Sequence, residues 1–533
     1  MKKFKTIYIS LVVAVALSAS SCIGDLDQYP VIEDTSKSVY TSVENYKMVL
    51  AKLYASYVIS GQEKGGGNGD ISGSNTGQDY MRVYVNMQEV PTDELAYTWG
   101  EGDKLYDLTY MNWDSNDNWA SDMYYHIYYT VALCNEFLRN ATEVAISGFS
   151  DGDKAQIRVF RAEARFLRAL AYCHAIDLFG DVPFVDENDP VGDYLPPQYT
   201  RSQLFGFVES ELKDIEDILP APAATEYGRA SQAAAWALLA RLYLNGEVYT
   251  GNVYYTECIT YCNKVFLGGF SLESDYAKLF NADNHLRTNE IIFAFNVDAT
   301  HTMSWGATTY IICGSVSSSN SQQVPADYGV SSGWTSFRAK NGLTSKFTDL
   351  TGATDQRAMF FTDGQSAAVT NIDDEFTGYL FTKWTNLTDA GQAASNTAAD
   401  GVSTDLPIFR LADVNLMFAE AVVRGGTGAT RTEALAKVND VRTRAYHGTP
   451  AGNIADGEMT LDFLLNERAR ELYLESVRRT DLIRFGKFTG SDYVWEFKGG
   501  TAAGSGVDAK YRLYPIPATE LTANPNIKST PGF

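Results

Sequence analysis

The sequence contains few cysteines, and it has fewer basic than acidic residues. Among 533 residues there are six cysteines, and 43 lysines and arginines stand against 66 acidic residues, which gives a net charge of −23. The five cysteines after Cys22 are odd in number and follow no framework spacing, which argues against a disulfide scaffold. Cys258 and Cys262 have no histidine at ligand spacing, so we expect buried free thiols there. The acidic charge disfavours nucleic acid as a partner and favours a neutral ligand.

Sequence patterns of several common enzyme classes are also missing. The five histidines are scattered without an H-E-x-x-H pattern, and the chain has no P-loop. With 66 acidic residues, carboxylate pairs can arise anywhere and carry little information about glycoside hydrolysis. We expect the run Asp373, Asp374 and Glu375 to form a solvated acidic turn. These patterns do not indicate an enzyme, although a glycosidase that uses one of the carboxylate pairs stays an alternative to test.

No apolar run is long enough to span a bilayer. The first 21 residues combine a basic start, an apolar run over residues 7–17 and small residues 19–21 before Cys22, which is the layout of a secretory signal. The small residues before a cysteine resemble a bacterial lipoprotein box, in which Cys22 becomes the acylated first residue. Several acyl chains at about 0.8 kcal/mol per buried methylene would hold the protein on a membrane. Cleavage by the ordinary peptidase, with Cys22 incidental, is the alternative.

Helical periodicity dominates the rest of the chain. Apolar residues from 153 to 179 recur every three or four positions, and Gly180 can take the left-handed conformation that ends such a helix. Residues 233–266 and 411–445 each resemble two helices around a glycine-containing turn, a tetratricopeptide-like hairpin. A last long helix is expected from Leu461 to about Thr480. The predicted fold is therefore mostly α, a scaffold of helix hairpins.

Long polar, glycine-rich stretches interrupt this scaffold. They cover residues 61–79, 299–345 and 350–405, and loops of such length inside a compact protein are usually functional or disordered. A helical scaffold with elaborate loops suits surface recognition better than a buried catalytic pocket.

Three aromatic residues stand out because they lie in polar surroundings. Trp99 occurs in "AYTWGEGD", Tyr310 in "GATTYIICG" and Trp334 in "SSGWTSF". An exposed aromatic ring can stack on the C–H face of a sugar while neighbouring polar groups bind its hydroxyls. The alternative for each is that it anchors its loop to the scaffold.

Three longer motifs carry a family resemblance. They are "RAEARFLRALAYCHAIDLFGDVPFV" (161–185), "NERARELYLESVRRTDLIRFGKF" (466–488) and "LYPIPATELTANPNIKSTPGF" (513–533), and "CIGDLDQYP" follows the signal. Together they resemble the SusD/RagB family. The resemblance implies a lipoprotein anchored through Cys22 in the outer membrane and facing the cell exterior, with one helical domain over 22–533. Within it, a helical N-terminal part would extend to about residue 290 and a loop-rich part over about 291–533.

The same resemblance implies a function without catalysis. Members of this family capture glycans for a SusC-type TonB-dependent transporter, while separate surface glycosidases release the oligosaccharides. The sequence is most similar to the starch-binding member. Carried over by position, Trp99, Tyr310 and Trp334 would form a curved stacking platform, and Arg82 would hydrogen-bond sugar hydroxyls. An α-glucan such as a maltooligosaccharide is then the expected ligand.

One position departs from the starch-binding pattern. Gly102 stands where that member has an asparagine, and Glu101 or Asp103 is expected to take over its hydrogen bond. One alternative is that the ligand is a different neutral glycan, and another is that the protein is a transporter lid with no glycan site of its own. No cofactor is expected. The sequence does not decide whether a structural calcium ion is bound, because oxygen ligands such as Asp283 and Asn284 are too ordinary to single out.

Polar residues on the scaffold motifs are expected to play a structural part. We expect internal ion pairs or helix caps, with no ligand contact, from Arg165, Glu467, Arg478 and Asp481.

Overall fold

The computed structural model describes residues 36–63, 65, 69–71, 78–394 and 401–533. The predicted signal peptide and Cys22 lie outside the described residues. The chain forms two compact units, Met1–Met48 and Val49–Phe533. The described part of the first holds α2 (Ser36–Val39) and the beginning of α3 (Val43–Ala55). The paragraphs below concern the second unit.

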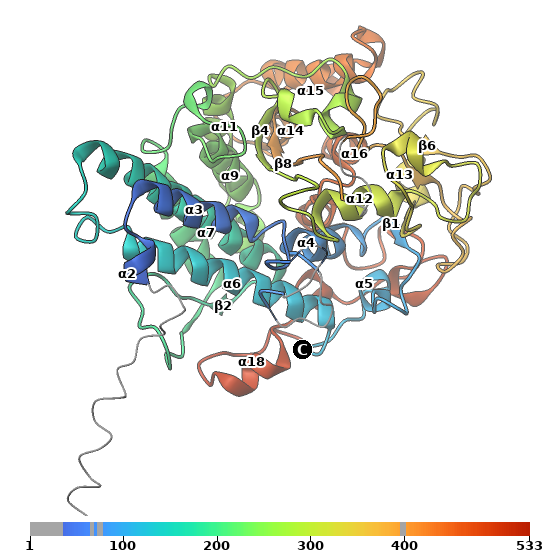
Figure 1. The fold of residues 1–533 in the computed structure, drawn as a ribbon. Coiled ribbons are helices and arrows are strands. Elements are labelled where there is room, and N and C mark those ends of the chain that lie inside the picture. Colours follow the sequence, from blue (N-terminus) through green and yellow to red (C-terminus); the bar gives the residue numbers. More distant parts are fainter. Residues whose placement is uncertain (1–35, 64, 66–68, 72–77, 395–400) are drawn as a thin grey trace, which may run out of the picture. The chain divides into compact units, whose positions relative to one another are not determined.

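The second unit is mostly helical, as the periodicity predicted (Figure 1). Its further helices are α4 (Tyr80–Glu89), α5 (Tyr106–Tyr110), α6 (Asn118–Asn140), α7 (Asp151–Leu178), α8 (Arg201–Ile215), α9 (Gln232–Leu244), α10 (Gly246–Thr250), α11 (Tyr255–Phe266), α12 (Ala307–Ser315), α13 (Asn341–Thr344), α14 (Leu411–Val423), α15 (Arg431–Ala445), α16 (Leu461–Leu472), α17 (Arg478–Arg484) and α18 (Ala518–Ala523).

Strands are short and pair only two by two. The antiparallel pairs among the described residues are β1 (Leu95–Tyr97) with β5 (Phe337–Ala339), β2 (Val182–Pro183) with β3 (Gln198–Tyr199), β4 (Ile291–Phe295) with β8 (Leu406–Arg410), and β6 (Phe360–Phe361) with β7 (Leu380–Phe381).

Both predicted helix hairpins are present. Helix α9 packs against α11, and α14 packs against α15, with α11 and α14 in contact so that the two hairpins stack. Alanines on the buried face of α9 let its partners approach closely. Gly426, in the turn of the second hairpin, is required because a Cβ there would lie 2.8 Å from the Tyr255 carbonyl group. The helix ahead of the hairpins, α7, also ends as predicted, since Gly180 has a φ of +80°.

Two predictions about local structure were wrong. The expected helix from Leu461 to about Thr480 is two helices, α16 and α17, because Leu474 and Ser476 between them have left-handed backbones with φ of 57° and 60°. A tertiary contact stabilises this break, since the Ser476 amide donates to the buried Glu89 carboxylate at 2.6 Å. The stretch 299–345 is also not a continuous loop. It contains α12 and β5, and all nine residues of α12 are buried.

The predicted internal ion pairs are confirmed. Each of the four scaffold residues has a partner of opposite charge: Arg165 pairs with Glu211, Glu467 with Arg357, Arg478 with Asp93, and Asp481 with Arg468.

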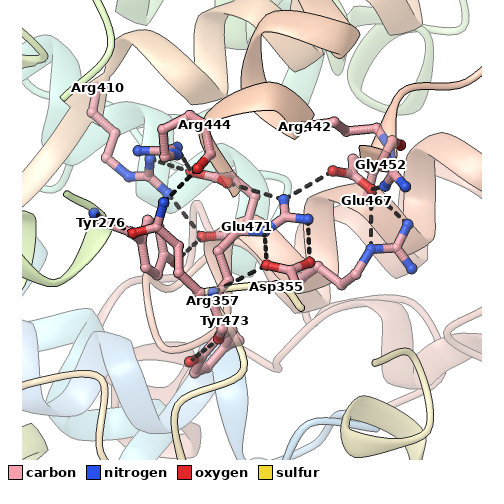
Figure 2. Close-up of polar contacts among 12 residues, drawn as sticks. Tyr276, Asp355, Arg357, Arg410, Arg442, Arg444, Gly452, Glu467, Glu471 and Tyr473 are labelled. Carbon is pink, nitrogen blue, oxygen red and sulfur yellow. Dashed lines mark hydrogen bonds and ion pairs between the residues drawn. The ribbon is translucent and has the colours of Figure 1, made fainter. Parts of the chain in front are cut away.

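One of these pairs belongs to a larger buried network (Figure 2). Glu471 on α16 accepts hydrogen bonds from Arg410 at the end of β8, from Arg444 on α15 and from Arg357 in the segment before β6. Arg357 also donates to Glu467 one turn earlier on α16. Every charged group in this network has a partner of opposite sign, so no buried charge is left unpaired. The network therefore holds α15, α16 and β8 together.

The remaining local predictions concern cysteines and membrane segments. Cys258 and Cys262 are buried free thiols, as expected. Among the described helices, none combines the length and the apolar character needed to cross a bilayer.

Candidate functional site

The β1–β5 ladder brings two of the predicted platform residues to one place. Beyond the last strand pair, the Thr98 amide still donates to the Ser336 carbonyl at 3.0 Å. Trp99 follows Thr98, and Trp334 lies two residues before Ser336, so both indoles emerge at the same end of the ladder. Trp99 is 42% exposed and Trp334 is half-buried. Segments more than 230 residues apart thus meet at this end of the ladder.

The backbone around Trp334 is tightly constrained. Its amide donates to the Cys313 carbonyl of α12 at 2.7 Å. Thr335 has a φ of 51°, a left-handed conformation that costs a β-branched residue free energy. Gly333 is required on the other side, because a Cβ there would collide with the Val316 carbonyl oxygen. The backbone that carries the indole is therefore held against the C-terminal end of α12.

The structure corrects the prediction for Tyr310. This residue lies on α12 and not in a loop, and its side chain is 0% exposed. Its hydroxyl donates to Asn86 Oδ1 at 2.7 Å, and the guanidinium carbon of Arg82 lies 4.1 Å from its ring centroid. The ring therefore has no free face for a sugar. An apolar helix buried all round explains the difference, and Tyr310 supports Arg82 instead.

Arg82 joins the loop of Trp99 to a second exposed tryptophan. It lies in the first turn of α4 and is 8% exposed. One terminal nitrogen donates to the Trp305 carbonyl at 2.7 Å, and the other lies 3.8 Å from the Asp103 carboxylate. The Tyr97 hydroxyl also donates to that carboxylate. Arg82 and Asp103 thus form a polar centre between Trp99 and Trp305.

Trp305 is a candidate site residue that the sequence reasoning missed. Of the eight tryptophans, all within the described residues, Trp305 and Trp99 are the two exposed ones, at 44% and 42%. The signal was present in "MSWGATTY", five residues before Tyr310. Gly306 after it is required, because a Cβ there would collide with the Asp79 carboxylate.

The residues at the departure from the starch-binding pattern lie on the surface. Glu101 and Gly102 are exposed, and Asp103 is half-buried. A Cβ at Gly102 would find only the Trp99 carbonyl oxygen at 3.9 Å, so the position has room for a side chain. The Asp103 carboxylate already interacts with Arg82 and with the Tyr97 hydroxyl. Of the two acidic residues, Glu101 is therefore the one whose carboxylate is available to a ligand.

Within the described ranges, no group of three or more His, Cys, Asp or Glu side chains is placed to hold a metal ion. The Asn284 amide donates to the carbonyls of Leu279 and Asp405 and accepts from the Asp405 amide. Its polar atoms therefore stabilise the loop directly.

Comparisons with known proteins agree with this fold. The model of the SusD family matches residues 349–533, and a model described as starch-binding associating with outer membrane matches residues 35–244. Since a member of the first family is 32% identical along the whole chain, the protein belongs to the SusD family. That relative is the starch-binding protein SusD of Bacteroides thetaiotaomicron, and the match covers 100% of this chain and 99% of the relative.

Solved structures share the fold at lower identity. Surface glycan-binding protein A from Bacteroides thetaiotaomicron, in complex with laminarihexaose, matches with a TM-score of 0.69 at 18% identity, over 92% of this chain and 100% of that chain. A SusD superfamily protein from Parabacteroides distasonis matches with a TM-score of 0.70 at 20% identity, over 94% of this chain and 100% of that chain. The predicted family and helical fold are confirmed.

Proposed function

We propose that this protein is a non-catalytic cell-surface binder of a starch-like α-glucan. The observation that carries the proposal is the placement of the Trp99 and Trp334 segments at one end of the β1–β5 ladder, with Arg82 linking Asp103 of the Trp99 loop to the exposed Trp305. Flat apolar faces beside fixed hydrogen-bonding groups are what a polyol ring requires. The full-length similarity to a starch-binding relative supports an α-glucan such as a maltooligosaccharide.

The wider role rests on the family resemblance. The protein would hold the glucan at the outer face of the outer membrane, anchored by a lipid on Cys22, and deliver it to a SusC-type TonB-dependent transporter. Surface glycosidases of the same system would supply the oligosaccharides. The net charge of −23 fits a ligand without charge.

Native affinity electrophoresis of the mature chain tests the ligand class. Gels containing amylopectin, dextran or xyloglucan are compared for wild type, Trp99→Ala and Trp334→Ala. Leu267→Ala is the control because it removes a side chain that is 89% exposed outside the site. We expect retardation by amylopectin that either tryptophan variant reduces and the control retains.

Other outcomes separate the alternatives. Retardation by another glycan alone would change the ligand to a different neutral polysaccharide, a class for which the laminarihexaose complex of a similar fold gives a precedent. No retardation in any gel would favour a transporter lid without a glycan site. Release of reducing ends from soluble starch would make the protein a glycosidase and refute the proposal.

A further inference from the structure

A surface turn beside the site exposes an aromatic ring that the argument above does not use. Residues 371–377 form the acidic turn predicted from the sequence, in which Asp373 is exposed while Asp374 and Glu375 are half-buried. Phe376 in this turn is 42% exposed, the same fraction as Trp99. An exposed phenylalanine among three carboxylates has no evident role in stability.

A buried arginine binds the backbone carbonyls of this turn. Arg338 on β5 is 0% exposed, and its guanidinium donates to the carbonyls of Asp374 at 2.6 Å and Thr377 at 2.5 Å, and to that of Ile372. Its Nε donates to the Thr98 hydroxyl at 3.1 Å, next to the exposed indole of the site. Burial lowers the pKa of Arg338 to about 10, while the charges of Asp374, Asp373 and Glu375 act in the opposite direction. A buried guanidinium is costly unless its donors are satisfied, so these hydrogen bonds and the nearby carboxylates hold it in place.

A second contact ties the turn to the loop of Trp99. The Tyr106 hydroxyl donates to Asp373 Oδ1 at 2.5 Å. The ring of Tyr106 lies against Gly100, where a Cβ would collide with it. Ile372 of the turn packs in a small apolar cluster that includes Ala96 of β1 and Tyr106. The turn and the loop of Trp99 are thus parts of one rigid assembly.

A third contact reaches toward Trp334. The Gln365 side chain donates to the Glu375 carbonyl at 2.9 Å and accepts from the Asn320 amide at 3.2 Å. Two residues before Asn320, the Ser318 amide donates to the hydroxyl of Thr335 at 2.6 Å, and Thr335 follows Trp334 in the chain. The turn that carries Phe376 is therefore connected to both indole-bearing segments.

We propose that Phe376 is a further stacking platform for the glucan, placed beside Trp99 and Trp334 by Arg338 as a positioning residue. The inference rests on the proposed function and extends its site toward longer chains. The phenyl face meets the C–H face of a sugar, and the carboxylates of the turn accept from its hydroxyls. The same carboxylates repel uronic or sulfated glycans, so the added subsite takes a neutral chain.

Isothermal titration with maltoheptaose tests the platform. We expect Phe376→Ala to raise the Kd about 2- to 10-fold, the range that an aromatic contact gives. Phe376→Tyr keeps the ring and should bind like wild type. An unchanged Kd for Phe376→Ala, while Trp99→Ala weakens binding, overturns this inference and leaves the proposed function intact. A wild-type protein that binds no maltoheptaose overturns both.

A double-variant cycle tests the positioning role of Arg338. Arg338→Gln is expected to weaken maltoheptaose binding as much as Phe376→Ala does, and the double variant should bind no worse than either single variant. Circular dichroism confirms that each variant is folded. Losses that multiply in the double variant would show that Arg338 acts on binding by another route and refute its role in placing Phe376.

Discussion

Replacing Glu471 by glutamine is expected to destabilise the fold by about 3 kcal/mol or more. The carboxylate is 0% exposed and accepts from Arg410 at 2.6 Å, Arg444 at 2.5 Å and Arg357 at 3.1 Å. Burial alone would raise its pKa, but the three guanidinium groups lower it from 4.5 to about 2. At about 1.4 kcal/mol for each tenfold change in proton affinity, this difference corresponds to about 3 kcal/mol.

The same pKa sets the pH dependence of the effect. Because the folded-state pKa of Glu471 lies below its ordinary value, its stabilisation is fully present above about pH 4.5 and is lost as the pH falls toward about 2. In Glu471→Gln, the side chain at position 471 has no group that titrates in this pH window. The difference in unfolding free energy between wild type and Glu471→Gln should therefore shrink on acidification.

Urea unfolding followed by tryptophan fluorescence measures this difference at neutral pH and at about pH 3. Glu143→Gln is the matched control, since Glu143 pairs with Arg158 at 2.7 Å but the two side chains are 67% and 48% exposed. We expect the control to unfold like wild type. A Glu471→Gln midpoint equal to that of the control, or a destabilisation independent of pH, would refute the reasoning.

Three further predictions concern the glucan site. Trp305→Ala should raise the Kd for maltoheptaose about 2- to 10-fold in titration calorimetry while the Tm stays near wild type, because the indole is 44% exposed; an unchanged Kd would remove Trp305 from the site. Gly102→Asn should lower that Kd about 2- to 10-fold by restoring one hydrogen bond in open space, and weaker binding would contradict this. Tyr310→Phe should lower the unfolding free energy by about 1–2 kcal/mol through the lost bond to Asn86 without changing the Kd, whereas lost binding would give Tyr310 a ligand contact.

The sequence determined the scaffold because its signals are local. Apolar residues repeating every three or four positions specify a helix from neighbours along the chain, and this was enough for α7 and for the hairpins α9–α11 and α14–α15. Internal ion pairs were predictable for Arg478 and Glu467 since charged residues on buried helical faces need partners. Trp99 and Arg82 were placed in the site through the family resemblance, which carries tertiary information that periodicity lacks.

The tertiary structure alone decided which rings face solvent. Tyr310 and Trp305 are five residues apart in the chain, yet the first is fully buried and the second is 44% exposed. The difference comes from Arg82, more than 220 residues earlier, whose guanidinium covers the ring of Tyr310 and binds the carbonyl of Trp305. Likewise, the break between α16 and α17 depends on the distant Glu89. Exposure and local strain depend on what distant segments pack against a residue, which no short stretch of sequence contains.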